Sequence, residues 1–394
     1  MISVQEAKKA ILENSSELTM ELVPLAKSCG RVLAGDVYAA IDIPNYPQSS
    51  MDGYAFNYND WKEFGSLPLS GEMAAGSNRE GALKPGTAVR IFTGAAVPAG
   101  ADTVVIQERS LIENGLLNIQ DDELKQGENV RLKGSEVTEG SLALKKGHAL
   151  SPAALGFLAG FGITDVLLYR NPSVKIIVTG NELQMPGLPL GYGQVYESNS
   201  FALRSALQQA GIEDIEVCQA GDQLEELTKT LTDSMEASDL ILLTGGVSVG
   251  DYDFTLKAAA ACGIDDVFHK IKQKPGKPIY FGRKGNQLVF GLPGNPASVL
   301  TCFYEYVTIA LQRMTHRSIE LKKKQLPLAG KFKKGAGLTH FLKAWYDEKG
   351  VAVLDAQESY RLHSFARANC LVQINEEVTF CEEGGLVEVH VLPV

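Results

Sequence analysis

The feature that most constrains the fold is an alternation of apolar strands and amphipathic helices that begins near residue 173. Apolar runs such as VKIIVTG, DLILLTGG and QLVFGLPG are separated by segments with helical spacing of apolar residues. Strands that are apolar along their whole length, joined by helices, indicate a mostly parallel, doubly wound sheet with helices on both faces. In such a sheet, ligands bind beyond the carboxyl ends of the strands. We therefore expect an α/β domain whose site lies at one edge of its sheet.

The rest of the chain shows other patterns. Ser3 and Glu6 form a capping box that predicts a helix at the start, and Ser151 followed by Pro152 predicts another. Short apolar runs separated by Gly, Asp and Asn turns over residues 65–148 indicate a β-rich module. A basic linker over residues 321–335 leads into alternating segments typical of a small β domain. A chain of 394 residues is long enough for this many domains.

Composition excludes several classes of partner. The net charge of -10 argues against broad binding of nucleic acid or of an anionic membrane, which needs a basic face. There is no apolar stretch of about 20 residues and no signal-peptide pattern, so we expect a cytoplasmic protein. The six cysteines are scattered without the short Cys/His spacing of a zinc site.

The stretch LTGGVSVGDYDF, residues 243–254, joins a predicted strand to a predicted helix. Gly245, Gly246 and Gly250 let the backbone approach a ligand, and their N–H groups suit a phosphate. The pattern is neither a P-loop nor GxGxxG, which weakens ATPase and dinucleotide-binding interpretations. A turn with a purely structural role explains the same glycines equally well.

Carboxylates occur at successive strand ends. They are Glu182, Asp222, Asp251 and Asp253, and the topology would gather them around one cleft. Carboxylates beside phosphate-binding lysines are a usual way to hold Mg²⁺. The sequence therefore predicts an anion that binds together with its metal.

Two further loops belong to this edge. HKIKQKPGKP concentrates Lys270, Lys272, Lys274 and Lys277, which could neutralise an oxyanion or form a solvated charged run. GLPGNPAS, which starts a helix near Pro296, is explained equally well as a ligand contact or as a turn with a helix cap. No Ser-His-Asp, Cys-His or HExxH pattern is present, which argues against covalent catalysis.

Six separated motifs, taken together, resemble one family. SMDGYA, IFTGA, VTGNEL, LTGGVSVGDYD, KPGKP and GLPGNP occur in the order and approximate spacing of the molybdopterin molybdenumtransferases, the MoeA-like group that includes the C-terminal part of gephyrin. The resemblance covers essentially the whole chain. It departs from relatives at KGSEV, where a frequent acidic pair is reduced to Ser135-Glu136, and at SYRLHSFARANC, which lacks a Gly/Ser-rich run.

The resemblance implies an α/β plus β multidomain fold. A doubly wound, mostly parallel α/β molybdopterin-binding domain is joined by an inserted β-rich domain, a helical/β linker domain and a C-terminal β-barrel-like domain. The expected bounds are 1–20, 40–50 and 140–172 for the linker domain, 21–39 and 51–139 for the inserted domain, 173–318 for the α/β domain and 319–394 for the C-terminal domain.

The implied reaction transfers molybdenum from molybdate into adenylylated molybdopterin and releases AMP, with Mg²⁺ assisting. The family forms homodimers with an active cleft shared between subunits, and a molybdopterin adenylyltransferase is the implied upstream partner. The catalytic residues implied by the matched motifs are Asp52, Thr93, Glu136, Glu182, Asp222 and Asp253, with Glu182, Asp222 and Asp253 as metal ligands. The residues expected to bind the pterin substrate or oxyanion are Gly245, Gly246, Ser248, Gly250, Lys270, Lys274, Pro293 and Pro296. Asp251 ranks below Asp253, because only Asp253 matches a functional position of the family.

Two other functions remain open. A nucleotide pyrophosphate hydrolase could use the same α/β domain, but it would not explain SMDGYA and IFTGA in the first 170 residues. A non-catalytic molybdopterin-binding scaffold would not need the full set of acids.

Overall fold

The computed structural model describes residues 1–76, 81–246 and 254–393 and divides into two compact units. Unit 1 consists of Met1–Glu21, Gly30–Val32 and Leu168–Val394, and unit 2 consists of Leu22–Cys29 and Leu33–Leu167. The chain passes between the units within strands β1 (Met20–Pro24) and β12 (Asp165–Tyr169), and also on either side of the short segment Gly30–Val32. Ser248, Gly250, Asp251 and Asp253 lie outside the described residues.

A mixed sheet of unit 1 has the strand order β16–β13–β17–β21–β20–β18. The first four strands run parallel, whereas β20 is antiparallel to β21 and β18 is antiparallel to β20. The predicted mostly parallel sheet is therefore confirmed. The strand bounds are β13 Val174–Thr179, β16 Ile215–Ala220, β17 Leu240–Thr244, β18 Asp265–His269, β20 Tyr280–Lys284 and β21 Gln287–Leu292.

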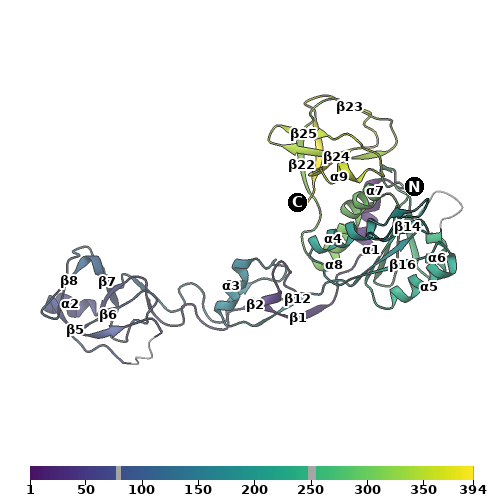
Figure 1. Ribbon diagram of the computed structural model, residues 1–394. Coiled ribbons are helices and arrows are strands. Elements are labelled where there is room, and N and C mark those ends of the chain that lie inside the picture. The colour runs from purple at the N-terminus through teal and green to yellow at the C-terminus, as the bar shows by residue number, and fades with distance from the viewer. Residues whose placement is uncertain (77–80, 247–253, 394) are drawn as a thin grey trace. The chain divides into compact units, whose positions relative to one another are not determined.

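Alternate side chains of these strands enter two separate apolar cores. Ile176 and Leu242 face one core, whereas Ile177 and Leu243 face the other, because successive side chains of a strand point to opposite faces. Helices cover both faces, as the doubly wound prediction requires (Figure 1). The first core is covered by α1 Val4–Asn14, α4 Asn199–Gln209, α7 Pro296–Cys302 and α8 Thr308–Thr315, and the second by α5 Leu224–Met235 and α6 Phe254–Ala261.

The helix starts follow the sequence signals. Ser3 caps α1 through the predicted capping box with Glu6, and Ser151 caps α3 (Pro152–Gly160) with Pro152 at its first turn. The helix predicted to start near Pro296 begins there but is interrupted. A π-helical turn, Phe303–Val307, separates α7 from α8.

A second sheet of unit 1 combines strands of the C-terminal residues with β19 of the lysine loop, in the order β19–β24–β26–β28–β22, with β25 paired to β24. The basic stretch expected to be a linker contains strand β22, whose lysines lie on the exposed edge of this sheet. The bounds are β19 Gln273–Lys274, β22 Lys322–Pro327, β23 Phe332–Lys333, β24 Thr339–Asp347, β25 Gly350–Val353, α9 Leu362–Phe365, β26 Cys370–Ile374, β27 Phe380–Cys381 and β28 Leu386–Val391. Two short strands, β14 Leu183–Gln184 and β15 Val195–Tyr196, complete the described strands of the unit.

Unit 2 is rich in β structure, as predicted. Its main sheet has the order β7–β4–β6–β5–β9–β8, with apolar clusters on both faces. The bounds are η1 Leu25–Lys27, β2 Val37–Tyr38, β3 Gln48–Ser49, β4 Gly53–Phe56, α2 Tyr58–Phe64, β5 Ser66–Met73, β6 Ala88–Ile91, β7 Thr103–Ile106, η2 Gln107–Arg109, β8 Ser110–Glu113, β9 Leu116–Ile119, β10 Val130–Arg131 and β11 Leu142–Leu144.

Candidate functional site

The predicted loops of unit 1 leave the same edge of the sheet. The residue pairs Thr179 with Ala220 and Thr244 with Leu292 place the ends of β13, β16, β17 and β21 side by side. Tyr280 lies opposite both Gly291 and His269, so the lysine loop between β18 and β20 also starts and ends at this edge. We call this edge, with its five loops, the carboxyl edge.

The turn after β17 comes very close to its neighbour β13. Gly245 and Gly246 have φ values of +85° and +65°, which favour glycine. A Cβ atom on Gly245 would lie 2.5 Å from the carbonyl oxygen of Thr179, and one on Gly246 would lie 3.2 Å from Oγ1 of both Thr179 and Thr255. Glycine therefore fits this turn better than any residue with a side chain.

Two buried hydroxyl groups flank this turn. Thr244 ends β17 and Thr255 lies in the first turn of α6, and the two residues are 1% and 0% exposed. Within the described ranges, neither Oγ1 atom has a hydrogen-bond partner. A buried hydroxyl without a partner is unfavourable, so these groups mark a place where polar contacts remain to be made.

Two of the predicted acids reach the carboxyl edge. Asp222 follows β16 and accepts a hydrogen bond from the backbone N–H of Asn181 at 3.1 Å, which ties two loops together. Glu182 follows β13 and is exposed. Over the part of the chain that the structure describes, no group of three or more His, Cys, Asp or Glu residues could hold a metal ion. The third predicted ligand, Asp253, lies outside that part.

The loop after β21 is held by residues that the sequence did not single out. Asn199 of α4 donates a hydrogen bond to the carbonyl of Gly294 at 2.8 Å. Ser359, from the C-terminal residues, accepts from Asn295 Nδ2 at 2.8 Å and, through its carbonyl, from the N–H of Ala297 at 3.0 Å. Pro293 is buried and Pro296 begins α7. No local motif identifies Asn199 or Ser359, since both act across long sequence separations.

The lysines of the loop between β18 and β20 have different surroundings. Lys270 adopts φ +71°, and Lys272 forms an ion pair with Glu376 at 3.4 Å. Lys274 is exposed and belongs to β19, opposite His340 of β24. Burial, together with the charges of Lys334 and Lys274, lowers the pKa of His340 to about 4, so His340 is neutral at neutral pH. The residue paired with Lys274 across the strands is therefore uncharged at neutral pH.

Unit 2 brings Asp52 and Thr93 together. They flank the paired ends of β4 and β6, and Asp52 Oδ1 accepts from the N–H of Thr93 at 2.7 Å and from its Oγ1 at 2.8 Å. These bonds, aided by the charge of Arg90, lower the pKa of Asp52 and keep it ionised. Gly53 is required because a Cβ atom there would lie 1.9 Å from the carbonyl oxygen of Val105.

Glu136 is exposed in a different loop of unit 2. Its N–H donates to the carbonyl of Ile43 at 2.9 Å, and Gly134 in the same loop has φ +69°. Lys133 instead forms an ion pair with Asp42 at 3.2 Å. The loop is thus fixed by its backbone, which leaves the carboxylate of Glu136 at the surface.

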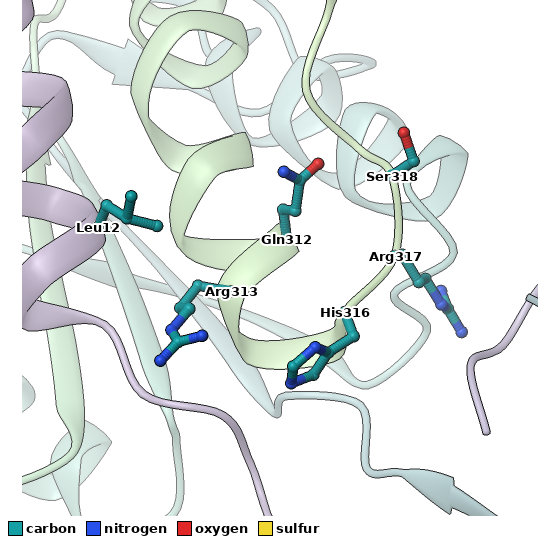
Figure 2. Close-up of a pocket in the computed structure, with 6 residues that line it drawn as sticks. All are labelled: Leu12, Gln312, Arg313, His316, Arg317 and Ser318. Atoms are coloured by element: carbon teal, nitrogen blue, oxygen red, sulfur yellow. The ribbon is translucent and has the colours of Figure 1, made fainter. Parts of the chain in front are cut away.

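The opposite edge of the same sheet carries a cationic pocket of about 370 Å³ (Figure 2). Figure 2 shows Arg313, His316 and Arg317 around the end of α8. Arg317 Nη1 donates to the carbonyls of Ala210 and Gly211 at 3.1 and 2.7 Å, just before β16 begins. Positive charge at a helix C-terminus stabilises the helix, so the pocket is explained by its structural role. No sequence motif predicted a ligand there.

Comparisons with known proteins cover both units. Family models described as "MoeA N-terminal region (domain I and II)", "Probable molybdopterin binding domain" and "MoeA C-terminal region (domain IV)" match residues 2–162, 175–313 and 325–392. Across the described residues, no helix is long and apolar enough to cross a membrane.

Individual relatives agree with these models. A molybdopterin molybdenumtransferase of Haemophilus influenzae is 33% identical over 387 residues, which are 96% of this chain and 95% of the relative. A relative of the same name from Nostoc sp. is 36% identical over 307 residues, or 76% of this chain and 70% of its own. A solved molybdopterin biosynthesis MoeA protein from Pyrococcus horikosii superposes with a TM-score of 0.87 at 30% identity over 100% of both chains. The resemblance inferred from the six motifs is confirmed, and the chain belongs to the molybdopterin molybdenumtransferase family of enzymes.

Proposed function

We propose that this protein inserts molybdenum from molybdate into adenylylated molybdopterin and releases AMP, in a Mg²⁺-dependent reaction of molybdenum cofactor biosynthesis. Family membership supports the reaction class. The observation that carries the proposal to this chain is the carboxyl edge, where a glycine turn closely packed on β13 lies beside loops bearing Glu182 and Asp222.

The substrate is a pyrophosphate with a large negative charge, and this edge offers two kinds of contact for it. The N–H groups of Gly245 and Gly246 can bind phosphate oxygens, and Ser248 and Gly250 extend the same turn in the sequence. Pro293 and Pro296 shape the adjacent loop, and Lys270 and Lys274 supply positive charge for the molybdate oxyanion. Little covalent chemistry is asked of the protein, because the dithiolene sulfurs of the substrate ligate the molybdenum. Orientation and charge stabilisation are the main contributions of the protein.

Glu182 and Asp222 fit a Mg²⁺ ion by their chemistry. Mg²⁺ prefers oxygen ligands and usually keeps several waters while it bridges one or two carboxylates to substrate phosphates, so two acids suffice. When bound, Mg²⁺ would neutralise charge on the pyrophosphate as it is cleaved. Asp222 is already oriented by the N–H of Asn181, and Asp253 is the third proposed ligand.

Asp52, Thr93 and Glu136 belong to unit 2, and we propose that they act on the same substrate in a homodimer with a shared cleft. Asp52 is preorganised for this role by Thr93. The domain boundaries predicted from the sequence, a cytoplasmic location and an upstream molybdopterin adenylyltransferase belong to the same proposal. Sedimentation that finds only monomer under assay conditions would contradict the shared cleft.

One assay separates this function from its alternatives. Purified protein is incubated with adenylylated molybdopterin and Mg²⁺, with molybdate, tungstate or no oxyanion, and both AMP and pterin-bound metal are measured. The transferase releases AMP and incorporates metal only when an oxyanion is present. AMP release without oxyanion and without incorporation would instead indicate a pyrophosphate hydrolase, and binding of the pterin without AMP release would indicate a scaffold.

A further inference from the structure

One buried side chain, that of Gln273, holds the turn that carries Lys274 and Lys277 by hydrogen bonds. Gln273 is 0% exposed, and its Nε2 donates to the carbonyls of Pro275 and Gly276 at 3.0 and 3.2 Å. Its Oε1 accepts a hydrogen bond from the hydroxyl of Tyr306. The side-chain amide therefore donates to the turn, with Cys302 Sγ as a further acceptor at 3.6 Å, and accepts from the helical segment that carries Tyr306.

Tyr306 reaches Gln273 from the π-helical turn Phe303–Val307. Such turns interrupt α-helices rarely and often occur at functional sites. Burial raises the pKa of the Tyr306 hydroxyl, which keeps it a hydrogen-bond donor. The preceding residue, Glu305, is fixed by Lys8 and by His390 Nδ1 at 2.6 Å, so the π-helical turn is anchored on both sides.

The turn is also packed tightly against Gln273 and Cys302. Gly276 has φ +84°, and a Cβ atom there would lie 2.5 Å from Cys302 Sγ and 2.8 Å from Gln273 Nε2. In β19, Gln273 points inward and Lys274 outward, because side chains alternate along a strand. The inward anchor thereby determines the direction of the outward lysine.

We infer that Gln273 is a positioning residue that, held by Tyr306, orients Lys274 and Lys277 for oxyanion binding. The inference rests on the proposed role of the lysine loop as the molybdate-binding element. Without the amide, the carbonyls of Pro275 and Gly276 would lose these hydrogen bonds, and the lysines would sample several directions. Oxyanion affinity should then fall although both lysines remain present.

The test is a double-mutant cycle measured by calorimetric titration with molybdate. Gln273→Met keeps the approximate volume but removes the hydrogen bonds, and we expect it to weaken molybdate binding about five- to thirtyfold. Tyr306→Phe removes only one hydroxyl, and we expect a loss of about two- to fivefold. In a chain with Lys274→Ala and Lys277→Ala, the further effect of Gln273→Met should drop below about twofold, because it acts through the lysines.

Thr315→Val is the matched control. It removes a buried hydroxyl bonded to the carbonyl of Leu311 at 2.8 Å, at the far end of the same helical segment, and should leave molybdate affinity unchanged. Steady-state kinetics with molybdate should show a raised KM with little change in kcat for Gln273→Met, which a general loss of folding would not produce.

The outcomes separate the inference from the function on which it rests. Unchanged affinity in the chain lacking both lysines would overturn the proposed role of Lys274 and Lys277 in oxyanion binding, and the inference with it. Loss of affinity in that chain, combined with normal binding by Gln273→Met or with an additive effect of Gln273→Met, would overturn the inference alone.

Discussion

The two edges of the α/β sheet use the same residue types for different purposes. At the amino edge, Asp239 accepts two hydrogen bonds from Arg170 at 2.8 Å and another from the N–H of Ser173 at 2.8 Å. At the carboxyl edge, Asp222 accepts one backbone N–H at 3.1 Å, and within the described residues no partner is found for the carboxylate of Glu182. The carboxylate of Asp239 is therefore engaged in structural hydrogen bonds, whereas those of Asp222 and Glu182 retain free lone pairs.

Glycines at the two edges show the same contrast. Gly245 and Gly211 both have positive φ, +85° and +78°. A Cβ atom on Gly245 would meet the backbone of a neighbouring strand, but on Gly211 it would meet the end of the Arg317 side chain. The carboxyl edge is therefore built from closely packed backbone that presents polar groups outward. The amino edge is closed by side chains that bond one another.

The largest expected effect concerns the acids. Glu182→Gln and Asp222→Asn each remove a charge without changing size, and each should lower AMP release by about 100-fold or more, the scale of a lost electrostatic contact in a transition state. Glu17→Gln, which removes an amino-edge acid bonded to His316 at 2.9 Å, should leave the rate within about twofold. AMP release by both carboxyl-edge variants at the wild-type rate would remove the functional distinction between the edges.

A smaller effect is expected for the matched glycines. Gly245→Ala and Gly211→Ala should both lower the free energy of unfolding, by about 1–3 kcal/mol, because alanine is strained at positive φ. Gly245→Ala should also weaken binding of adenylylated molybdopterin about tenfold or more, since its Cβ would displace the turn. Thermal denaturation and titration with the pterin measure the two effects. Equal pterin affinity in both variants would show that this turn does not bind the substrate.

The third prediction affects stability but not activity. Partial burial alone would raise the pKa of Asp239, but Arg170 and Ser173 outweigh it, so the folded pKa lies below the ordinary value of 3.8. Its stabilisation is therefore complete above pH 3.8 and lost as the pH falls through the folded pKa. Asp239→Asn should lower the Tm at pH 7, and its difference from wild type should shrink below pH 3.8. A Tm difference independent of pH down to pH 2 would contradict this origin of the stability.

Local sequence signals predicted the elements well. The capping box at Ser3, the Ser151-Pro152 start of α3 and the apolar runs of β13, β17 and β21 depend on neighbours a few residues away. The parallel order of those strands follows from the helices that join them. Since parallel strands end at one edge, the sequence also predicted that Glu182, Asp222 and the glycine turn share an edge.

Other features depend on residues far apart in the chain. Strand β22 lies in a stretch that the sequence predicted to be a linker. The strand was missed because its pairing partner, β28, follows about 60 residues later in the chain. The π-helical turn is fixed by Lys8 and His390, and the loop after β21 by Ser359. No local pattern contains these partners.

The sequence by itself determined the family, the order of elements and the edge at which we propose that ligands bind, because these depend on short-range periodicity and on motifs contiguous in the chain. The tertiary structure decided which charges remain available. Asp239, Lys272 and Arg317 are satisfied by distant partners, whereas Asp222 is only partly satisfied and Lys274 is exposed. The physical reason is that the hydrogen bonds and ion pairs of a charged group depend on its neighbours in space. Those neighbours come together only in the folded chain.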